Sequence, residues 1–354
     1  MDVAQFDFDL PGELVALRPA RPRDAARMLV IDADGRMEHA FVNALPDCLR
    51  AGDILVANDT KVIAARLRGR RLPREGRAGE GPKVELLLHK RLGEARFCAF
   101  ARPARRLARD DELVLGETLR ARVAARGEGG EMEVQFEARG AELDAAIARE
   151  GEMPLPPYIA ARRPVDARDV LDYQTMFARH EGSVAAPTAG LHFTPELLAR
   201  LHAAGVTRQS LTLHVGAGTF LPVNVADTAE HTMHCEWANI SQAAAESLNA
   251  ARDAGNRIVA VGTTSLRALE CASDETGRIR PWTGETALFI TPGYRFRTAD
   301  VLLTNFHLPR STLFMLVCAF SGLETMKRAY AQAITERYRF YSYGDACLLF
   351  RQRT

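Results

Sequence analysis

Cysteine is scarce in this sequence and widely spaced. The six cysteines stand at positions 48, 98, 235, 271, 318 and 347, and no two of them form a C-x-x-C pair. This spacing argues against a disulfide framework, a structural zinc site and an iron–sulfur cluster. We therefore expect small buried thiols in a reducing compartment, and no bound metal.

Long apolar segments are also lacking. The longest uninterrupted apolar run, Leu313 to Phe320, is far shorter than the roughly 18 residues that a membrane-spanning helix needs. The first ten residues contain three aspartates and lack the basic and apolar stretches of a signal peptide. We expect a soluble cytoplasmic protein with no membrane partner, and a chain of 354 residues leaves room for two domains.

The net charge of +1 hides an uneven distribution of charge. Residues 61–109 contain fifteen Lys or Arg and four Glu, whereas residues 127–151 contain seven acids and two Arg. A local surplus of positive charge attracts phosphate groups. The alternative is that these arginines only cover a solvated surface, as most charge runs do.

Strand and helix patterns alternate in residues 1–60 and again after residue 157. The expected elements are strands 28–32 and 54–57, helix 196–204, strand 209–215, helix 242–254, strand 257–261, a helix from 265, strands 287–290 and 301–303, and a helix from 311. Alternation of this kind predicts an α/β fold whose main domain has a largely parallel sheet covered by helices.

The middle of the chain has a different character. Short strand-like runs at 84–89, 97–101, 112–115, 119–124 and 132–136 are separated by Gly, Pro and charged turns. Strands at such close spacing predict a small antiparallel β-barrel. The run Pro154-Leu155-Pro156-Pro157 marks its end. We therefore expect an α/β catalytic domain formed by 1–60 and 158–354, interrupted by an inserted β-barrel domain at 61–157.

The most informative run extends from Thr304 to Thr312. It predicts a strand that delivers Asn305 and His307 into a loop, followed by a helix that begins at Ser311 or Thr312. Polar groups at such a crossover are where α/β proteins usually place ligands.

A second crossover extends from Val261 to Arg267 and places Gly262 before three hydroxyl residues. A helix start presents free backbone N–H groups and a positive dipole end to an anion, and Arg267 can grip a carboxylate or phosphate. The alternative is ordinary helix capping with a solvated Arg267.

Two further loops combine histidine with glycine. In the loop Pro187 to Thr194, His192 lies just before a helix N-terminus, where the dipole favours the neutral imidazole that a general base requires. A structural histidine is the alternative. In the loop Leu213 to Phe220, glycines let the backbone approach a ligand closely.

Other patterns are less specific. V-G-A-G-T at 215–219 resembles the glycine loop of a Rossmann methyltransferase, yet extended chain follows where that fold needs a helix. His231, His234 and Glu236 could ligate a metal, but further ligands at suitable spacing are missing. The aromatic runs 291–296 and 338–345 can stack on nucleic-acid bases or simply close the core.

Several longer runs identify a family. The chain closely resembles the S-adenosylmethionine:tRNA ribosyltransferase-isomerases of queuosine biosynthesis over its whole length. The matching runs are residues 6–11, 58–63, 151–159, 173–175, 183–194, 213–222, 231–236, 261–270, 304–312 and 338–345. Competing interpretations are an S-adenosylmethionine-dependent RNA methyltransferase and an RNA-binding module without catalysis.

The resemblance implies an unusual transferase reaction. Enzymes of this family move the ribosyl part of S-adenosylmethionine onto the aminomethyl group of a 7-deazaguanine base in the wobble position of tRNA, and they isomerise it to epoxyqueuosine. Adenine and methionine leave. Because the sulfonium acidifies the adjacent C5′ protons, a positioned base can begin the reaction, and we expect no cofactor besides S-adenosylmethionine as co-substrate. We expect tRNA as the partner, no obligate protein partner, and a monomer.

The resemblance also suggests roles for the loop residues. His192 or His307 would be the base, and Asp59 or His234 would assist proton transfer. Thr263, Ser265 and Arg267 would bind the methionine carboxylate, while Asn305, Tyr294 and Tyr343 would hold a nucleoside or the target base. The other expected substrate-binding residues are Thr188, Gly190, His214, Gly216, Gly218, Thr219 and Asp345, and the expected tRNA-binding residues are Arg66, Arg68, Arg70 and Arg71.

Overall fold

The computed structural model describes residues 1–74, 80–216 and 223–352. Contacts within the chain divide it into two compact units. The first unit comprises Met1–Thr60, Gln174–His180 and Ala186–Thr354, and the second comprises Lys61–Tyr173 and Glu181–Ala185. The insertion predicted for residues 61–157 falls within the span of the second unit.

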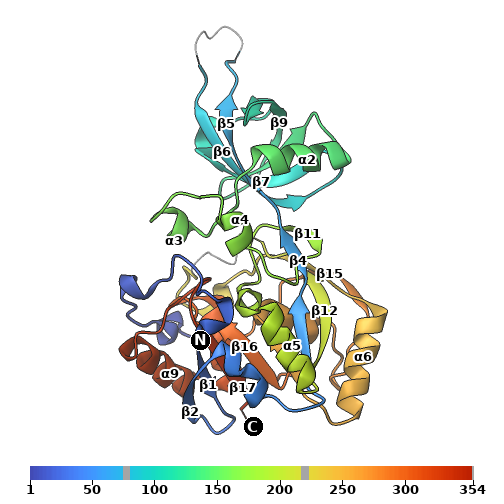
Figure 1. Ribbon diagram of the computed structural model, residues 1–354. Coiled ribbons are helices and arrows are strands. Elements are labelled where there is room, and N and C mark those ends of the chain that lie inside the picture. The colour runs from blue at the N-terminus through green and yellow to red at the C-terminus, as the bar shows by residue number, and fades with distance from the viewer. Residues whose placement is uncertain (75–79, 217–222, 353–354) are drawn as a thin grey trace. The chain divides into compact units, whose positions relative to one another are not determined.

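A large sheet forms the centre of the first unit (Figure 1). Its described strands, in spatial order, are β15 (Trp282–Thr286), β13 (Glu236–Ile240), β12 (Thr207–Leu213), β3 (Ile54–Asn58), β14 (Ile258–Val261), β16 (Val301–Asn305), β17 (Ala346–Phe350), β1 (Arg27–Ile31) and β2 (Met37–Phe41). The strands β12, β3, β14 and β16 are parallel. β17 is antiparallel to β16 and parallel to β1, and the outer pairs are antiparallel.

The predicted α/β class is confirmed, as a mixed sheet whose central strands are parallel. Every residue of β3, β14 and β16 is buried, as expected for strands that are covered on both faces. The expected strand at 287–290 is wrong, because the strand in this region is β15, at Trp282–Thr286. The chain turns after it, where the Leu288 N–H donates to Thr286 Oγ1 at 3.1 Å.

Three helices of the first unit begin at hydroxyl caps. Thr194 Oγ1 accepts the Leu197 N–H at the start of α5 (Pro195–Ala203). Ser241 caps α6 (Gln242–Asp253), and Ser311 caps α8 (Thr312–Ser321), in the same way. The remaining described helices of this unit are α1 (Leu45–Cys48), α7 (Thr263–Cys271), α9 (Leu323–Thr335) and the 3-10 helices η1 (Val3–Phe6), η2 (Gly12–Leu14), η3 (Arg23–Ala25), η4 (Val42–Ala44), η6 (Thr188–His192) and η8 (Thr228–Glu230).

Helix α5 covers one face of the sheet (Figure 1). Its Leu197 and Leu201 belong to one buried cluster with alternate strand residues, namely Leu55, Ala57, Val259, Val261, Val301, Leu303, Ala346 and Leu348. Successive side chains of a strand point to opposite faces, so this alternate set defines the face that α5 covers. Helices α6, α7 and α8 also pack against the sheet, through β12, β14 and β17.

The second unit contains a closed antiparallel barrel, which confirms the predicted small barrel. Its strands, in spatial order, are β10 (Glu131–Phe136), β7 (Arg96–Arg102), β6 (Lys83–Arg91), β5 (Arg66–Arg71), β8 (Glu112–Leu115) and β9 (Leu119–Arg126). Sequence patterns missed β5, because arginines occupy most of its positions and only Leu67 is fully buried there.

Shorter elements complete the described chain. They are the helices α2 (Gly140–Glu150), α3 (Pro157–Ala160), α4 (Asp169–Asp172) and η5 (Ala104–Arg106), and the two-stranded sheet of β4 (Thr60–Val62) and β11 (His180–Ser183). Within the three described ranges, no helix has both the length and the apolar character needed to cross a membrane.

Candidate active site

The carboxyl ends of β12, β3, β14 and β16 lie at one edge of the sheet, because these strands are neighbours and parallel. The segments that follow them are Leu213–Gly216, Asn58–Thr60, Gly262–Arg267 and Asn305–His307. β17 is antiparallel to β16, so the segment before it, Tyr341–Asp345, reaches the same edge. Ligands of α/β proteins usually bind at this edge. We take it as the candidate active site.

Asp59 lies buried at the end of β3. Its Oδ1 accepts the Thr212 hydroxyl at 2.7 Å, and its Oδ2 lies 3.7 Å from Nε2 of His180, whose side chain is exposed. The backbone N–H groups of Arg179 and His180 donate to the Asp59 carbonyl. Sequence reasoning missed His180, because nothing in the sequence links it to a carboxylate so far away along the chain.

His214 lies beside Asp59, at the end of β12. Its Nδ1 is 2.8 Å from Thr60 Oγ1, and its ring stacks on Trp237 with the ring centroids 5.0 Å apart. Burial lowers the pKa of His214, the charge of His180 lowers it further, and Asp59 raises it. His214 is therefore mainly neutral near pH 7. One of its ring nitrogens donates a hydrogen bond and the other accepts one.

Helix α7 begins at the end of β14 without a side-chain cap. Its N-cap residue, Gly262, has φ = 87°, in the left-handed region that glycine favours. The Ser265 hydroxyl donates to the Val261 carbonyl at 2.8 Å and is therefore occupied. Thr264 Oγ1 is buried and has no hydrogen-bond partner among the described residues. The uncapped N–H groups of this first turn suit an anion.

Arg267 of α7 forms a buried ion pair with Glu236, with 2.5 Å between Nη1 and Oε2. The other oxygen of Glu236 accepts the Gly216 N–H at 3.1 Å, and Arg267 Nε donates to the Leu288 carbonyl at 3.0 Å. Arg267 Nη2 is buried without a partner in the described part of the chain. The Nη2 group of this guanidinium, with its two N–H donors, is thus available to a ligand that reaches α7.

His192 ends η6 and is only 4% exposed. Burial lowers its pKa to about 4, the charges of Arg339 and Arg23 act in the same direction, and the Asn305 side chain opposes them. Nε2 of His192 is buried and finds no hydrogen-bond partner in the described structure. At neutral pH this imidazole is uncharged and able to accept a proton.

His307 is held more completely than His192. Its Nε2 lies 2.9 Å from Thr304 Oγ1, and its backbone N–H donates to the Tyr330 hydroxyl at 2.9 Å. Burial lowers the pKa of His307 to about 3. Asn305, the last residue of β16, donates from Nδ2 to the Tyr341 carbonyl at 3.1 Å, and its Oδ1 is buried with no partner in the described ranges.

Tyr294 and Asp345 make internal hydrogen bonds. The Tyr294 hydroxyl donates to Glu270 Oε2 at 3.1 Å, and burial together with Glu270 raises the pKa of Tyr294. Asp345 accepts the Arg339 backbone N–H at 2.8 Å and lies 3.2 Å from its Nη2. Tyr343 is buried in the segment between Arg339 and Asp345. Asp345 therefore fixes Arg339, whose charge acts on His192.

The remaining candidates differ in their surroundings. Gly190 in η6 packs so closely that an added Cβ would lie 3.1 Å from Thr175 Cγ2. Thr188 begins the same 3-10 helix. His234 is exposed, in the loop before β13. Gly218 and Thr219 lie outside the described residues.

Buried polar atoms without hydrogen-bond partners gather at this edge. Within the described part of the first unit, such atoms include Thr175 Oγ1, His192 Nε2, Thr264 Oγ1, Arg267 Nη2 and Asn305 Oδ1. Thr175 belongs to the group because it packs against Gly190 of η6. Each unsatisfied buried group costs about 1–3 kcal/mol, so a cluster of them indicates a place that a polar ligand occupies.

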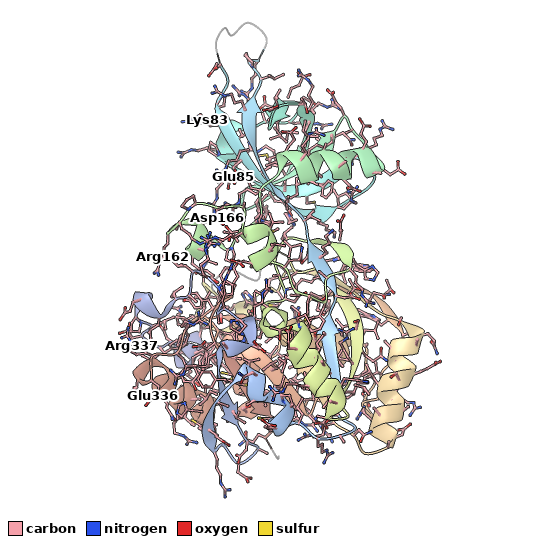
Figure 2. The ribbon with its side chains drawn as sticks, in the orientation of Figure 1. Lys83, Glu85, Arg162, Asp166, Glu336 and Arg337 are labelled. Atoms are coloured by element: carbon pink, nitrogen blue, oxygen red, sulfur yellow. The ribbon has the colours of Figure 1, made fainter. Side chains whose placement is uncertain are left out.

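The four arginines proposed for tRNA all lie on β5 and all have carboxylate partners. Arg66 and Arg68 pair with Glu85, Arg70 with Glu80, and Arg71 with Asp111 at 3.7 Å. Figure 2 shows Glu85 and Lys83 on β6. The side chains of Arg68 and Arg70 are 57% and 43% exposed, whereas those of Arg66 and Arg71 are 11% exposed. Of these four side chains, only those of Arg68 and Arg70 are exposed enough to contact a phosphate of tRNA.

Metal ligation has no support in the described ranges. They contain no group of three or more His, Cys, Asp or Glu side chains that could hold a metal ion. The six cysteines are all free thiols.

These features define an α/β enzyme with an inserted antiparallel barrel and a polar site at the carboxyl edge of its sheet. Residues 3–349 match the model of the family described as queuosine biosynthesis protein, and the chain belongs to that family. The resemblance noted in the sequence, and the expectation of an enzyme, are confirmed.

Known relatives carry names that agree with this assignment. The chain is 60% identical to the S-adenosylmethionine:tRNA ribosyltransferase-isomerase of Nitrobacter winogradskyi, over 98% of both chains. It is 59% identical to the enzyme of the same name from Phenylobacterium zucineum, over 99% of this chain and all of that one. The crystal structure of S-adenosylmethionine tRNA ribosyltransferase from Thermotoga maritima is similar with a TM-score of 0.55, at 35% identity over 98% of this chain and 100% of that chain.

Proposed function

We propose that this protein transfers and isomerises the ribosyl moiety of S-adenosylmethionine onto the 7-aminomethyl-7-deazaguanine wobble base of a tRNA. The products are epoxyqueuosine in tRNA, adenine and methionine. The cluster of buried polar atoms without partners at the carboxyl edge of the sheet carries the proposal, because a nucleoside with an amino acid tail offers donors and acceptors to such atoms. The names of the relatives favour this reaction over methyl transfer and over RNA binding without catalysis.

The methionine carboxylate fits the start of α7. This turn offers uncapped N–H groups, the Thr264 hydroxyl and the free Nη2 of Arg267. A carboxylate is stabilised by such donors and by the positive end of the helix dipole. Thr263 contributes its N–H and hydroxyl to the same turn, while the hydroxyl of Ser265 is already used within the helix. Gly216 is held near this group through Glu236.

His192 is the better of the two candidate bases. The base must remove a C5′ proton that the sulfonium has made acidic, which requires a neutral imidazole with a lone pair that no other hydrogen bond occupies. His192 is neutral and has an unpartnered Nε2, whereas the Nε2 of His307 is bonded to Thr304. We assign to His307 the task of shaping the loop that carries Asn305.

Proton transfer to the departing adenine needs a second group. Asp59 is the candidate at the edge itself, and its contact with the exposed His180 connects it with solvent. His234 remains a second candidate. We assign Tyr294, Tyr343, Asp345, His214, Thr188 and Gly190 to holding the nucleoside and the target base, directly or by fixing the loops.

The tRNA is the proposed macromolecular partner, and β5 is the proposed contact. Arg68 and Arg70 are exposed enough to meet phosphates, and each would exchange a weak surface carboxylate pair for a phosphate. Arg66 and Arg71 would support the strand beneath them. We further propose a cytoplasmic monomer that needs no metal, no redox cofactor and no protein partner, because the sulfonium itself activates the substrate.

The small-molecule products test this proposal. The protein is incubated with S-adenosylmethionine and tRNA that carries the aminomethyl-deazaguanine, and the filtrate is analysed by chromatography. Adenine and methionine in equal amounts support ribosyl transfer. S-adenosylhomocysteine as the product would identify a methyltransferase instead, and unchanged S-adenosylmethionine would indicate binding without catalysis.

A further inference from the structure

Asn305 differs from the other buried asparagines of the described chain. Asn58 donates from Nδ2 to the Leu213 carbonyl, and its Oδ1 accepts two backbone N–H groups. Asn249 donates to the Ile279 carbonyl and accepts the N–H of the same residue. Asn305 uses only its nitrogen, although it is 3% exposed. Its amide oxygen is thus kept for something other than folding.

The orientation of the Asn305 amide is fixed by the segment before β17. Its Nδ2 faces the carbonyls of Tyr341 and Ser342, at 3.1 and 3.5 Å. Two carbonyls cannot donate a hydrogen bond, so the amide cannot exchange its oxygen and nitrogen. Tyr341 has φ = 73°, which is unfavourable for a tyrosine, and its N–H donates to the Phe306 carbonyl at 3.0 Å. A strained residue thus holds the carbonyl that orients Asn305.

His192 is the nearby group that can use this oxygen. It ends η6, which packs against β16, the strand that ends in Asn305. The charges that act on it are those of Arg23 in η3 and of Arg339, which pairs with Asp345. Asp24 of η3 accepts the hydroxyl of Thr194, two residues after His192, and the neighbouring loop contributes the neutral His307. Arg23 and Arg339 oppose a positive charge on His192, whereas the Asn305 side chain favours it.

We propose that Asn305 is the positioning residue of His192. Its fixed Oδ1 accepts the N–H of one imidazole nitrogen, which selects one tautomer and leaves the lone pair of the other nitrogen for the substrate. When His192 takes the C5′ proton and becomes an imidazolium, the same hydrogen bond becomes charge-assisted and strengthens. Asn305 itself gains and loses no proton. The inference rests on the proposed function only for the identity of that proton.

Nuclear magnetic resonance of the substrate-free protein tests the pair without catalysis. With ¹⁵N-labelled histidine, wild-type His192 should show one tautomer at neutral pH. Asn305→Ala should give a mixture of both tautomers, and Asn305→Asp should raise the pKa of His192, because a carboxylate stabilises the imidazolium. Asn249→Ala, which empties a buried amide site elsewhere, should leave His192 unchanged. An unaltered tautomer and pKa in both Asn305 variants would overturn the proposal.

Kinetics supply the second readout. Asn305→Ala should lower the single-turnover rate of adenine release roughly ten- to hundredfold, with little change in KM for S-adenosylmethionine, since a base contributes about 10²–10⁴-fold. Asn305→Asp should recover part of the rate with its acid limb moved to higher pH. A rise in KM alone would make Asn305 a substrate-binding residue and contradict the inference. Failure of the wild-type protein to release adenine would reject the proposed function. The tautomer measurement would still show whether Asn305 orients His192.

Discussion

Nη1 of Arg267 lies 2.5 Å from Oε2 of Glu236, and the two side chains are 5% and 4% exposed. The pair connects α7 with β13 and, through the Gly216 N–H, with the glycine loop that follows β12. A buried pair of this kind is stable only when both charges are present, because each was taken out of water. We infer that the pair holds the guanidinium at the start of α7 with its Nη2 group unpaired.

Removal of one partner should therefore destabilise the protein strongly. We expect Arg267→Met to lower the free energy of unfolding by about 3–5 kcal/mol, since Glu236 is left as a buried unpaired charge. Arg267→Met with Glu236→Gln should recover most of the loss but should still bind S-adenosylmethionine weakly. Urea unfolding measures the stability of each variant, and isothermal titration calorimetry measures its affinity for S-adenosylmethionine. The exposed pair Lys327–Glu324 is the control, and its loss should change stability by under about 1 kcal/mol. Equal effects at both pairs would contradict this interpretation.

The two buried histidines should respond differently to substitution. His192→Ala should lower the single-turnover rate of adenine release by about 10²–10⁴-fold, because it removes the proposed base. His307→Ala should reduce the rate less, because its Nε2 is bonded within its own loop. Rapid quenching with detection of adenine measures both rates. Near-normal rates in both variants would show that neither histidine is the base.

Burial of His307 should make the protein less stable in acid. Its pKa is about 3 in the folded state and about 6.5 when unfolded, so only the unfolded chain binds this proton between those values. The contribution of the buried neutral His307 to the free energy of unfolding is therefore fully present above pH 6.5. It is lost progressively as the pH falls towards 3. His307→Gln should therefore reduce the slope of unfolding free energy against pH by up to about 1.4 kcal/mol per pH unit in this window. Chemical unfolding at several pH values checks it, with His202→Gln on the surface of α5 as the control. An unchanged slope would show that His307 is not buried as described.

Charge reversal on β5 should affect tRNA and not S-adenosylmethionine. Arg68→Glu with Arg70→Glu should weaken tRNA binding and reduce its salt dependence by about one counterion per lost phosphate contact. Arg278→Glu with Arg280→Glu is the matched control, because it also reverses two charges and these side chains of the first unit are 60% and 73% exposed. Filter binding at several salt concentrations measures both. If the control variant behaves like the β5 variant, the arginines contribute only general charge.

The sequence predicted the strands and helices that have clear periodicity or caps. Thr194 and Ser311 marked helix starts that the structure reproduces, and the buried strand at 54–57 became β3 with one more residue. The sequence did not predict β5, because alternation of Leu67 with arginines carries little apolar signal. It also misplaced β15, because an edge strand pairs on one side and its pattern is weak.

The site shows the same division. Loops after consecutive parallel strands were predictable, because topology alone brings their ends to one edge. The sequence could not show that Ser265 bonds within its helix, that Arg267 has a buried carboxylate partner, or that His180 faces Asp59. Each of these depends on a contact between two particular side chains or backbone groups, and the sequence contains no pattern that indicates such a contact.

The fate of the ribose tests the central claim most directly. S-adenosylmethionine with ¹³C in its ribose carbons is incubated with the protein and with tRNA that carries the aminomethyl-deazaguanine, and the digested nucleosides are analysed by mass spectrometry. The account predicts a wobble nucleoside that contains all the labelled ribose carbons, and a strong reduction of this product with His192→Ala. A wobble nucleoside that gains only an unlabelled methyl group would contradict it.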